Sequence, residues 1–419
     1  MTGIIIGFAA MLTCSCYYII KSDRTSQRPL IWSLYSLLLV FALYLFMIRV
    51  ADSLKTPVIW DFTAFYLYGK VASEGLNFYL PENYQLVFSS LHLPFSNFEG
   101  LVEEVVNVGC PYPPPTILYL IPLGLLPFKT ALVSWTAFNL LFLAGSIYLI
   151  FSMFFKSEKL NGLMLVLILF FISSPVRSTI SFSQTNFIIL FLLLLMKKYS
   201  DKNFPGILLT LAFFTKPYMI VFGLFFLLTK RWKAIAYSFL TAVIVGAITL
   251  IIIGRDTFMS YFSNNATNRI PIKVFAEQIN QSLHAVLLRA NLISMDKPYV
   301  YLIIAAIIFG ISLVLITHIL KQKKYDLLWP VLLLVTLLIY PATLNYYGVM
   351  LLFITFQFFN FRQPLGLNMY LNIPLIGLIY FLSSFSFFSA VCLMIIIIIT
   401  ISLRQYMPFK LKALISNEE

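Results

Sequence analysis

Continuous apolar blocks, separated by short polar stretches, dominate the sequence. A helix needs about 20 apolar residues to cross the hydrocarbon of a bilayer. Six blocks reach that length: 1–20, 30–50, 131–155, 234–253, 299–320 and 384–403. Shorter apolar blocks lie at 113–128, 160–174, 186–196, 204–215, 218–229, 327–340, 346–359 and 366–383. A transmembrane β-barrel would instead show short alternating segments. The pattern predicts an all-α polytopic membrane protein, a single integral membrane domain over 1–419 with roughly 11 to 14 hydrophobic segments.

Two long polar segments, 51–112 and 254–297, interrupt the apolar blocks. Lysine and arginine gather elsewhere, in short clusters between blocks such as the one at 21–28, which is typical of cytoplasmic loops. Seven of the 16 acidic residues lie within the first polar segment, against two bases. We therefore expect both polar segments to be non-cytoplasmic loops that carry short helices, with helices of the first loop at 61–76 and 81–91.

The composition narrows the class of protein. Of the 419 residues, 60% are hydrophobic and 11% are charged, whereas soluble domains carry about 25% charged residues. This excludes a soluble enzyme. The net charge of +13 comes from the loop clusters, so we expect membrane lipids as partners and no nucleic acid. Of the four cysteines, only Cys110 lies in an expected loop, so no disulfide framework is predicted.

The block at 113–128 conflicts with a simple count of crossings. The charge pattern places residue 112 outside and Lys156 inside, which requires an odd number of crossings, yet two apolar blocks lie between them. The first block is short and contains Pro122 and Pro127. We predict that it is a re-entrant or interfacial element, which membranes tolerate where protein covers the backbone.

Asp61 is the first candidate for chemistry. It opens the stretch DFTAFYLYGKV, just outside the membrane and among aromatic residues. A carboxyl in an apolar setting has a raised pKa and can act as a general base. The alternative is that Asp61 caps a helix over 62–74 by accepting backbone N–H bonds. The two roles are compatible.

Two further candidates lie within apolar sequence. Gln184 and Asn186 enter a hydrophobic block, where they can hydrogen-bond either a sugar hydroxyl or another helix. Lys216 lies between 204–215 and 218–229, which together would make a span of about 26 residues with the cation near its middle. An ammonium at that depth is costly unless it meets water or an anion. We expect Lys216 to contact a phosphate; an internal ion pair or a hairpin at the interface are the alternatives.

The second polar segment contains EQINQSLHAVLLRA. Arg289 follows Gln281 and Ser282 by close to two helical turns, so these three residues could share a face, and arginine suits phosphate. A solvated amphipathic helix is the alternative. His284 has no metal-ligand partner one turn away, and the chain has no P-loop, GxGxxG, HExxH or CxxC motif. We expect no metal and no cofactor.

The order of these motifs resembles glycosyltransferase family 87, the polyprenol-phosphate-mannose-dependent mannosyltransferases of the GT-C superfamily. The resemblance covers roughly residues 50–290. It is carried by DFTAFYLYGKV with NFYLP, YPPP…PLGLLPF, SQTN, KPYMIVFGLFFLLTKRWKA and NQSL…R. It implies a GT-C-type fold, an active site at the outer membrane surface, Asp61 as catalytic base and a sugar donor on a lipid phosphate. Where such chains carry a late histidine after a proline-containing turn, this one reads PATLNYYGVMLL, with Asn345.

The candidate residues and the family resemblance together predict a membrane hexosyltransferase of the bacterial cell envelope. It would move a hexose, mannose by resemblance, from a polyprenyl-phosphate donor to a lipid or glycan acceptor, with inversion. Lys216 and Arg289 would bind the donor phosphate. The expected sugar or acceptor contacts are Tyr66, Gln184, Asn186, Asn280, Gln281 and Asn345. The rival predictions are a lipid or glycan transporter or flippase, which would need paired ionisable residues within spans, and a polymerase or ligase of lipid-linked glycans.

Overall fold

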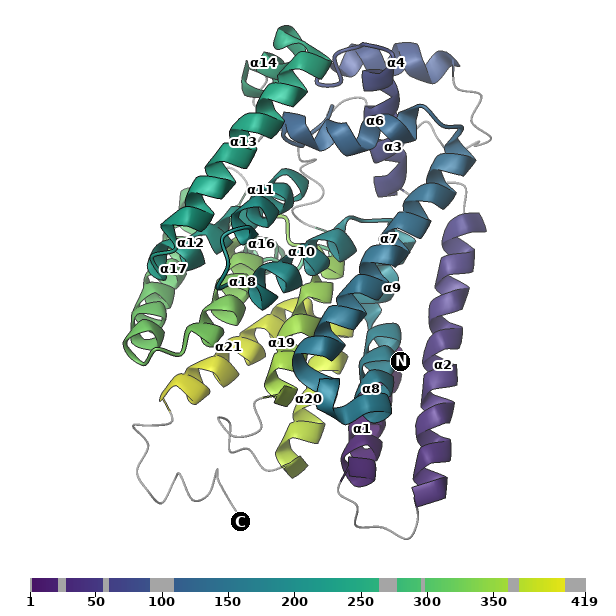
Figure 1. Cartoon of the computed structure of the whole chain (residues 1–419), viewed down its shortest axis with the longest axis vertical. Helices are drawn as coiled ribbons and strands as arrows, with labels where there is room; N and C mark the ends of the chain where they lie inside the picture. Colours follow the sequence, from purple (N-terminus) through teal and green to yellow (C-terminus); the bar gives the residue numbers. More distant parts are fainter. Residues whose placement is uncertain are drawn as a thin grey trace. The chain divides into compact units, whose positions relative to one another are not determined.

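The chain divides into two compact helical units. The computed structural model describes residues 2–21, 28–55, 60–90, 109–263, 277–294, 298–360 and 369–403. Within these ranges most residues are helical (Figure 1), and an isolated antiparallel bridge pairs Asn280 with Leu344. The first unit comprises Met1–Ile48, Ser146–Ser178 and Phe275–Glu419, and the second comprises Arg49–Gly145 and Thr179–Val274.

The elements of each unit follow from the apolar blocks. The first unit holds all or most of α1 (Thr2–Lys21), α2 (Arg28–Lys55), η2 (Phe151–Phe155), η3 (Lys156–Glu158), α8 (Lys159–Ile172), α9 (Ser174–Ser181), α16 (Leu283–Arg289), α17 (Pro298–Lys321), η6 (Tyr325–Leu327), α18 (Leu328–Ile339), η7 (Asn345–Met350), α19 (Leu351–Asn360), α20 (Met369–Phe385) and α21 (Phe387–Leu403). The second holds α3 (Trp60–Ser73), α4 (Pro81–Ser90), η1 (Pro114–Thr116), α6 (Ile117–Gly124), α7 (Phe128–Ile150), α10 (Asn186–Lys198), α11 (Pro205–Thr215), η4 (Pro217–Phe222), α12 (Gly223–Leu228), α13 (Trp232–Ile253) and α14 (Arg255–Ser263).

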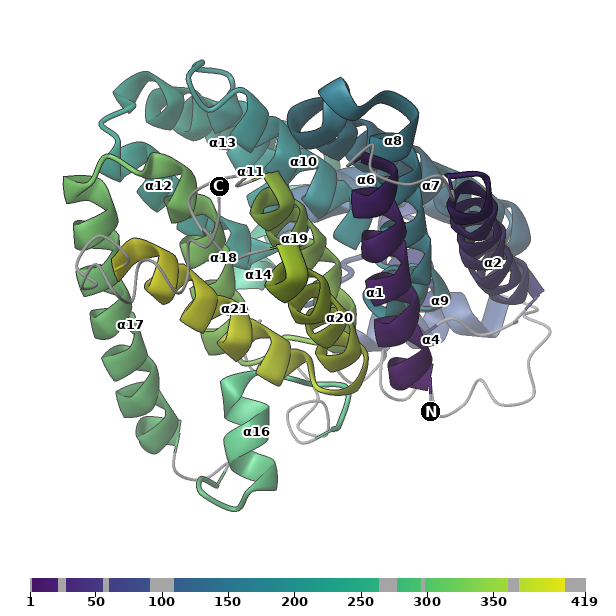
Figure 2. The ribbon, with the colours of Figure 1, turned by 90° about the horizontal axis from the view of Figure 1, so that it is seen from below.

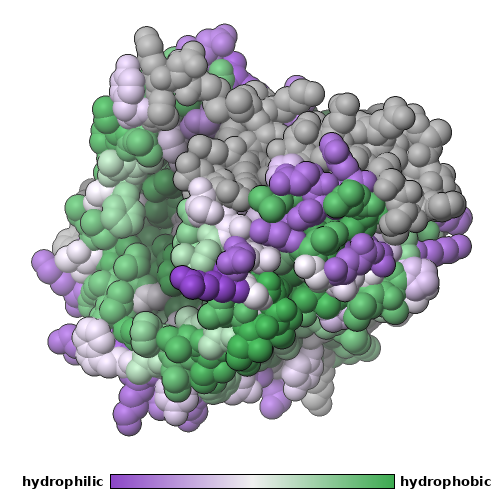
Figure 3. Space-filling model, turned by 90° about the horizontal axis from the view of Figure 1, so that it is seen from above, coloured by the Kyte–Doolittle hydropathy of each residue, from purple (hydrophilic) through white to green (hydrophobic). Residues whose placement is uncertain are grey.

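The long helices confirm the predicted class, an all-α polytopic membrane protein. Among the described residues, α1, α2, α7, α13 and α17 are long and apolar enough to cross a bilayer, and shorter apolar helices accompany them. The pair α8 and α9 meets at 57°, as a broken span or re-entrant element does. Large apolar side chains cover the outside of α13, where Ile251 is 82% exposed, and broad hydrophobic areas reach the molecular surface in Figure 3. Such a surface suits lipid and not water.

The two last apolar blocks follow the prediction with a shifted boundary. Separate segments were expected at 366–383 and 384–403, and the structure has α20 ending at Phe385 and α21 beginning at Phe387. Ser386 lies between them, and its Oγ accepts the backbone N–H of Ser389 at 3.4 Å. A serine that satisfies the first N–H groups starts a new helix. The helix boundary thus lies within three residues of the predicted one, and the serine cap, which hydropathy does not register, fixes its exact place.

Close packing of α1 against α20 organises the first unit (Figure 2). A Cβ on Gly7 would lie 3.0 Å from the carbonyl oxygen of Gly377, and a Cβ on Gly377 would lie 2.1 Å from the side chain of Met11. Small residues at such crossings let helix backbones approach each other in membranes. The hydroxyl of Tyr380 donates to the carbonyl of Leu169 at 3.0 Å, which ties α20 to α8.

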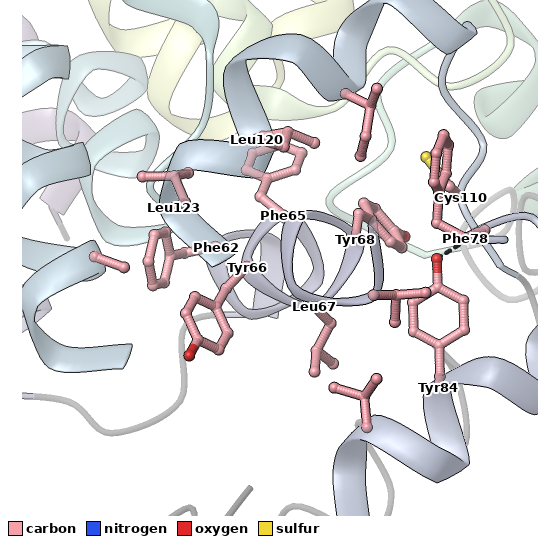
Figure 4. Close-up of a cluster of buried hydrophobic side chains, with 14 of the residues drawn as sticks. Phe62, Phe65, Tyr66, Leu67, Tyr68, Phe78, Tyr84, Cys110, Leu120 and Leu123 are labelled. Atoms are coloured by element: carbon pink, nitrogen blue, oxygen red, sulfur yellow. Dashed lines mark hydrogen bonds between the residues drawn. The ribbon is translucent and has the colours of Figure 1, made fainter. Parts of the chain in front are cut away.

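A second glycine contact positions the outer helices of the second unit. A Cβ on Gly69 would lie 2.1 Å from the carbonyl oxygen of Leu120, and one on Gly124 would lie 2.2 Å from the backbone of Gly69. Helices α3 and α6 therefore cross with their backbones in contact. Figure 4 shows Phe65 of α3 beside Leu120 of α6 within the buried cluster around this crossing. The crossing holds α3 firmly against the segment that precedes α7.

The polar segments largely follow the prediction where they are described. Helices α3 and α4 confirm the expected helices at 61–76 and 81–91. The block at 113–128 contains only the apolar stretch Pro114–Gly124, too short to span alone, as predicted. In the second polar segment the structure describes α14 and α16, while 264–276 lie outside the described residues.

Candidate active site

Asp61 lies in the first turn of α3 and is half-buried. The alternative prediction placed Asp61 just outside the helix, as its N-cap. The helix instead begins at Trp60, so Asp61 is part of it. A carboxylate in a first turn interacts favourably with the helix dipole. Phe62 and Phe65 of the same helix are buried, at 0% and 1% exposure. The apolar face of α3 is therefore anchored, and Asp61 has a defined position.

Lys216 occupies a break between helices. Helix α11 ends at Thr215, Lys216 is extended with φ −145° and ψ 106°, and the 3-10 helix η4 starts at Pro217. Proline excludes the helical conformation for the residue before it, which explains the break. The two apolar blocks flanking Lys216 are therefore separate short helices. The Lys216 N–H donates to Ala212 at 2.8 Å and its carbonyl accepts from Met219 at 3.0 Å, so the break leaves its backbone satisfied.

Gln184 follows a tight turn that leads into α10. Ser183 has a positive φ of 50°, a conformation uncommon for residues other than glycine. The indole N–H of Trp135 donates to the Ser183 carbonyl at 2.7 Å, and the N–H of Gln184 donates to Thr179 at 3.0 Å. Gln184 is 1% exposed. The turn thus holds a buried amide in a fixed place.

The structure brings Asp61, Gln184 and Lys216 together, and we call these three residues the carboxylate cluster. The Lys216 ammonium donates to Gln184 Oε1 at 3.1 Å, although Lys216 is only 4% exposed. The Gln184 side chain and the Lys216 charge both act on the Asp61 carboxyl. Burial raises the pKa of Asp61, while the Gln184 hydrogen bond and the Lys216 charge lower it; burial is the largest effect, and the pKa is raised overall.

Tyr112, from the proline-rich segment, borders the carboxylate cluster. The Lys216 ammonium lies 6.0 Å from the centre of the Tyr112 ring, at cation–π range. The Thr116 hydroxyl donates to the carbonyl of Phe214 at 2.5 Å, which attaches this segment to the end of α11. Tyr112 was not predicted, although its place beside three prolines was a usable signal. Trp135 was not predicted either, because an apolar block offers no signal for it.

Asn186 and Tyr66, two predicted contacts of the sugar or acceptor, have different surroundings. Asn186 starts α10, two residues after Gln184, and is fully buried. The Tyr66 hydroxyl donates to the carbonyl of Leu126 at 3.1 Å, and its ring packs edge-on against Phe128. Figure 4 shows Tyr66 pointing away from Tyr68 on the other side of α3. Its recorded contacts hold α3 against the start of α7.

The other predicted site residues lie in the first unit. One of them, Asn280, forms an amide clamp with Ser282 and the Pro341 carbonyl. Asn280 Nδ2 and Ser282 Oγ both donate to that carbonyl at 2.9 Å. The Gln281 N–H donates to Thr343 at 2.8 Å, and the Asn345 N–H donates to Ile279 at 2.9 Å. The clamp fastens the end of the second polar segment to the turn before η7.

Arg289 ends α16 and binds the backbone of the same segment. Its Nη1 donates to the carbonyls of Glu277 at 2.7 Å and Asn280 at 2.8 Å. Ser282 caps α16 by accepting the Ala285 N–H at 3.1 Å. Gln281 therefore precedes the helix, and the expected helical face shared with Arg289 does not form. The predicted phosphate contact of Arg289 is not tested by these bonds. Among the described residues, no group of three His, Cys, Asp or Glu side chains could hold a metal ion.

The fold and the carboxylate cluster define a polytopic membrane protein with a buried ionisable site. The family model of glycosyltransferase family 87 matches residues 111–341, more than half of the chain. The chain belongs to this family and is a membrane glycosyltransferase. Gln184 and Lys216 lie within the matched region, and Asp61 precedes it. The comparisons with curated proteins and with solved structures gave no match.

Proposed function

We propose that this glycosyltransferase moves a hexose, mannose, from a polyprenyl-phosphate donor to a hydroxyl of a lipid or glycan acceptor, on the outer face of a bacterial membrane. One observation carries the proposal. A carboxyl at Asp61 and an ammonium at Lys216, far apart in the sequence, are joined through Gln184 beside aromatic rings. The reaction needs an acceptor for a proton and a positive charge for a phosphate, and this cluster offers both.

Asp61 acts as the general base in this proposal. Its carboxylate takes the proton of the acceptor hydroxyl while that oxygen forms a bond to the anomeric carbon. The bond from this carbon to the phosphate oxygen breaks, and its electron pair leaves on the lipid phosphate. Attack from the face opposite the leaving group inverts the anomeric configuration. A carboxyl whose pKa is raised by burial is a stronger base than an exposed one.

Lys216 stabilises the negative charge on the departing phosphate. A cation that is already buried and oriented loses little solvation when the donor binds, and it acts most strongly where water is excluded. Its hydrogen bond to Gln184 uses one of the three donors of an ammonium group. Asn186 lies close in the chain to Gln184 and would bind a sugar hydroxyl. The assignments of Arg289 to the phosphate, and of Tyr66, Asn280, Gln281 and Asn345 to the sugar or acceptor, stay predictions.

Label transfer in proteoliposomes tests the proposal. The full chain is incubated with a polyprenyl-phosphate mannose labelled in the sugar and with an extract of bacterial envelope lipids and glycans. We expect label to leave the donor and enter an acceptor, and Asp61→Asn to stop this. Asp52→Asn removes an exposed carboxylate from the end of α2 and serves as the matched control. A donor that stays intact with every acceptor, or crosses the bilayer unchanged, contradicts the proposal.

A further inference from the structure

We propose that Gln184 and Trp135 are positioning residues: Gln184 holds the Asp61 carboxyl beside Lys216, and Trp135 holds Gln184 in place. This assigns Gln184 a role other than the predicted sugar contact and assigns Trp135 a role for the first time. The role of Asp61 as general base rests on the proposed function, whereas the contacts among these residues do not depend on it.

The side-chain amide of Gln184 can serve both neighbours in one orientation only. An ammonium group can only donate hydrogen bonds, and an ionised carboxylate can only accept them. Since Oε1 accepts from Lys216 at 3.1 Å, Nε2 is the group of the amide that can donate to Asp61, on whose carboxyl the Gln184 side chain acts. The amide is thus a bridge between a base and a cation. A methionine of similar length fills the space but offers neither bond.

The backbone around Gln184 is fixed on both sides. Ser183, with its positive φ, presents its carbonyl to the Trp135 indole, and the Gln184 N–H is bound to Thr179. A non-glycine residue in this conformation persists only where its surroundings impose it. The Ser183 N–H donates to the Ile180 carbonyl at 2.9 Å within the turn, and the 2.7 Å bond from Trp135 holds the turn from a different helix, α7.

Trp135 also contacts the helix that carries Asp61. Its ring lies edge-on to Phe65 at 5.9 Å, one helical turn after Asp61, and stacks on Tyr119 at 6.2 Å. The indole is 2% exposed. One buried side chain therefore touches both α3 and the turn of Gln184. It sets the separation of the carboxyl from the amide, which no residue on either segment could do alone.

The ionisation of Asp61 reports on this arrangement. The ionisable groups recorded as acting on or near its carboxyl are Lys216 and the phenol of Tyr112, and the Gln184 hydrogen bond lowers its pKa. Removing that bond removes a contact made to the charged form, so the pKa of Asp61 must rise. A residue that only filled space would leave the pKa where it is.

Infrared titration of the full chain in nanodiscs tests the proposal without any sugar donor. The carbonyl band of protonated Asp61 is identified by its loss in Asp61→Asn. In Gln184→Met we expect the midpoint of this band to move to higher pH. Gln357→Met is the matched control, because Gln357 is also buried, at 3% exposure, and donates to the Asp326 carbonyl at 3.0 Å in the first unit. Its midpoint should equal that of the unaltered chain.

Trp135→Phe keeps an aromatic ring and removes the indole N–H. We expect a smaller shift in the same direction. An unchanged midpoint in Gln184→Met overturns the role of Gln184, and an unchanged midpoint in Trp135→Phe overturns that of Trp135. Should Gln184→Met fail to fold, Trp135→Phe alone decides the proposal. The titration uses no sugar donor. A failure of label transfer would therefore contradict the proposed function without affecting the result of the titration.

Discussion

The carboxylate cluster of the second unit and the amide clamp of the first unit use similar polar side chains in opposite ways. In the clamp, the side chains of Asn280 and Ser282 both donate hydrogen bonds to the carbonyl of Pro341. In the cluster, Lys216 and Gln184 are hydrogen-bonded side chain to side chain, and Gln184 continues to Asp61. The clamp joins two stretches of backbone. The cluster joins two ionisable groups.

This difference separates structural from chemical roles. A buried amide that satisfies a backbone carbonyl contributes to stability, and its loss leaves that carbonyl unpaired. A buried carboxyl and ammonium cost desolvation energy, and such pairs are weak evidence for stability. Strongly perturbed ionisable groups with specific charge partners are candidates for function. Substitutions in the cluster should therefore change activity, and those in the clamp should change stability.

The largest effect is expected from Asp61→Asn. The amide keeps the shape of the side chain but cannot accept the acceptor's proton, and a general base contributes about 10²- to 10⁴-fold to rate. We expect transfer to fall by that amount while the melting temperature shows a folded protein. Single-turnover rates of label transfer provide the measurement. Full activity in this variant would show that the carboxylate cluster takes no part in the transfer reaction, and it would contradict the contrast with the amide clamp.

Lys216→Met should produce the next largest loss. A preorganised charge at a developing anion is worth about 10²- to 10³-fold, so transfer should fall by that factor. Because the Lys216 charge lowers the pKa of Asp61, its loss should also move the rise of activity to higher pH. Lys70→Met is the matched control, since Lys70 forms a surface pair with Glu74 at 3.3 Å, and such pairs contribute little. Equal losses in both variants would contradict a special role for Lys216.

Asn280→Ala sharpens the other side of the comparison. It removes the bond to Pro341 and the bond that Asn280 Oδ1 accepts from the Ser282 N–H at 3.1 Å. Loss of a buried hydrogen-bond partner costs about 1–3 kcal/mol. We expect a lower melting temperature and an unchanged pH dependence of transfer. A shifted pH dependence at normal stability would show that the clamp takes part in the chemistry.

Ser282→Ala should have the smallest effect. Ser282 caps α16, and loss of such a cap costs about 1 kcal/mol. Thermal unfolding is the readout, and Ser282→Gly should recover most of the loss, since glycine is tolerated at this position. No recovery in the glycine variant would mean that the bond to Pro341, and not the cap, carries the stability.

Much of the fold could be predicted because apolar blocks determine where helices lie in a membrane protein. Asp61, Gln184 and Lys216 were also chosen from sequence, each for its unusual polarity within or beside apolar residues. A shared site for Asp61 and Lys216 was expected from their roles, but the contacts that bring the three residues together could not be predicted. They depend on the left-handed turn at Ser183 and on one indole N–H from Trp135, and neither changes the hydropathy of its segment.

Other details of the structure differ from the sequence predictions because short polar signals compete with the apolar pattern. The break at Lys216 follows from Pro217, yet two flanking apolar blocks favoured one continuous helix. Gln281 was expected on one face with Arg289, but Ser282 caps α16 and leaves Gln281 outside the helix. In both places a single residue with a specific backbone preference decided the structure over the average of its neighbours.

The pH dependence of single-turnover transfer by the unaltered chain tests the central claim most directly. A base must be deprotonated to act, so activity should be absent below the pKa of Asp61 and should rise through it. Because that pKa is raised, the midpoint should lie above the ordinary carboxyl value of about 4. A rise with a single ionisation above that value, lost in Asp61→Asn, is the expected result. A rate that is flat across the acidic range, or a rise that persists in Asp61→Asn, contradicts the claim.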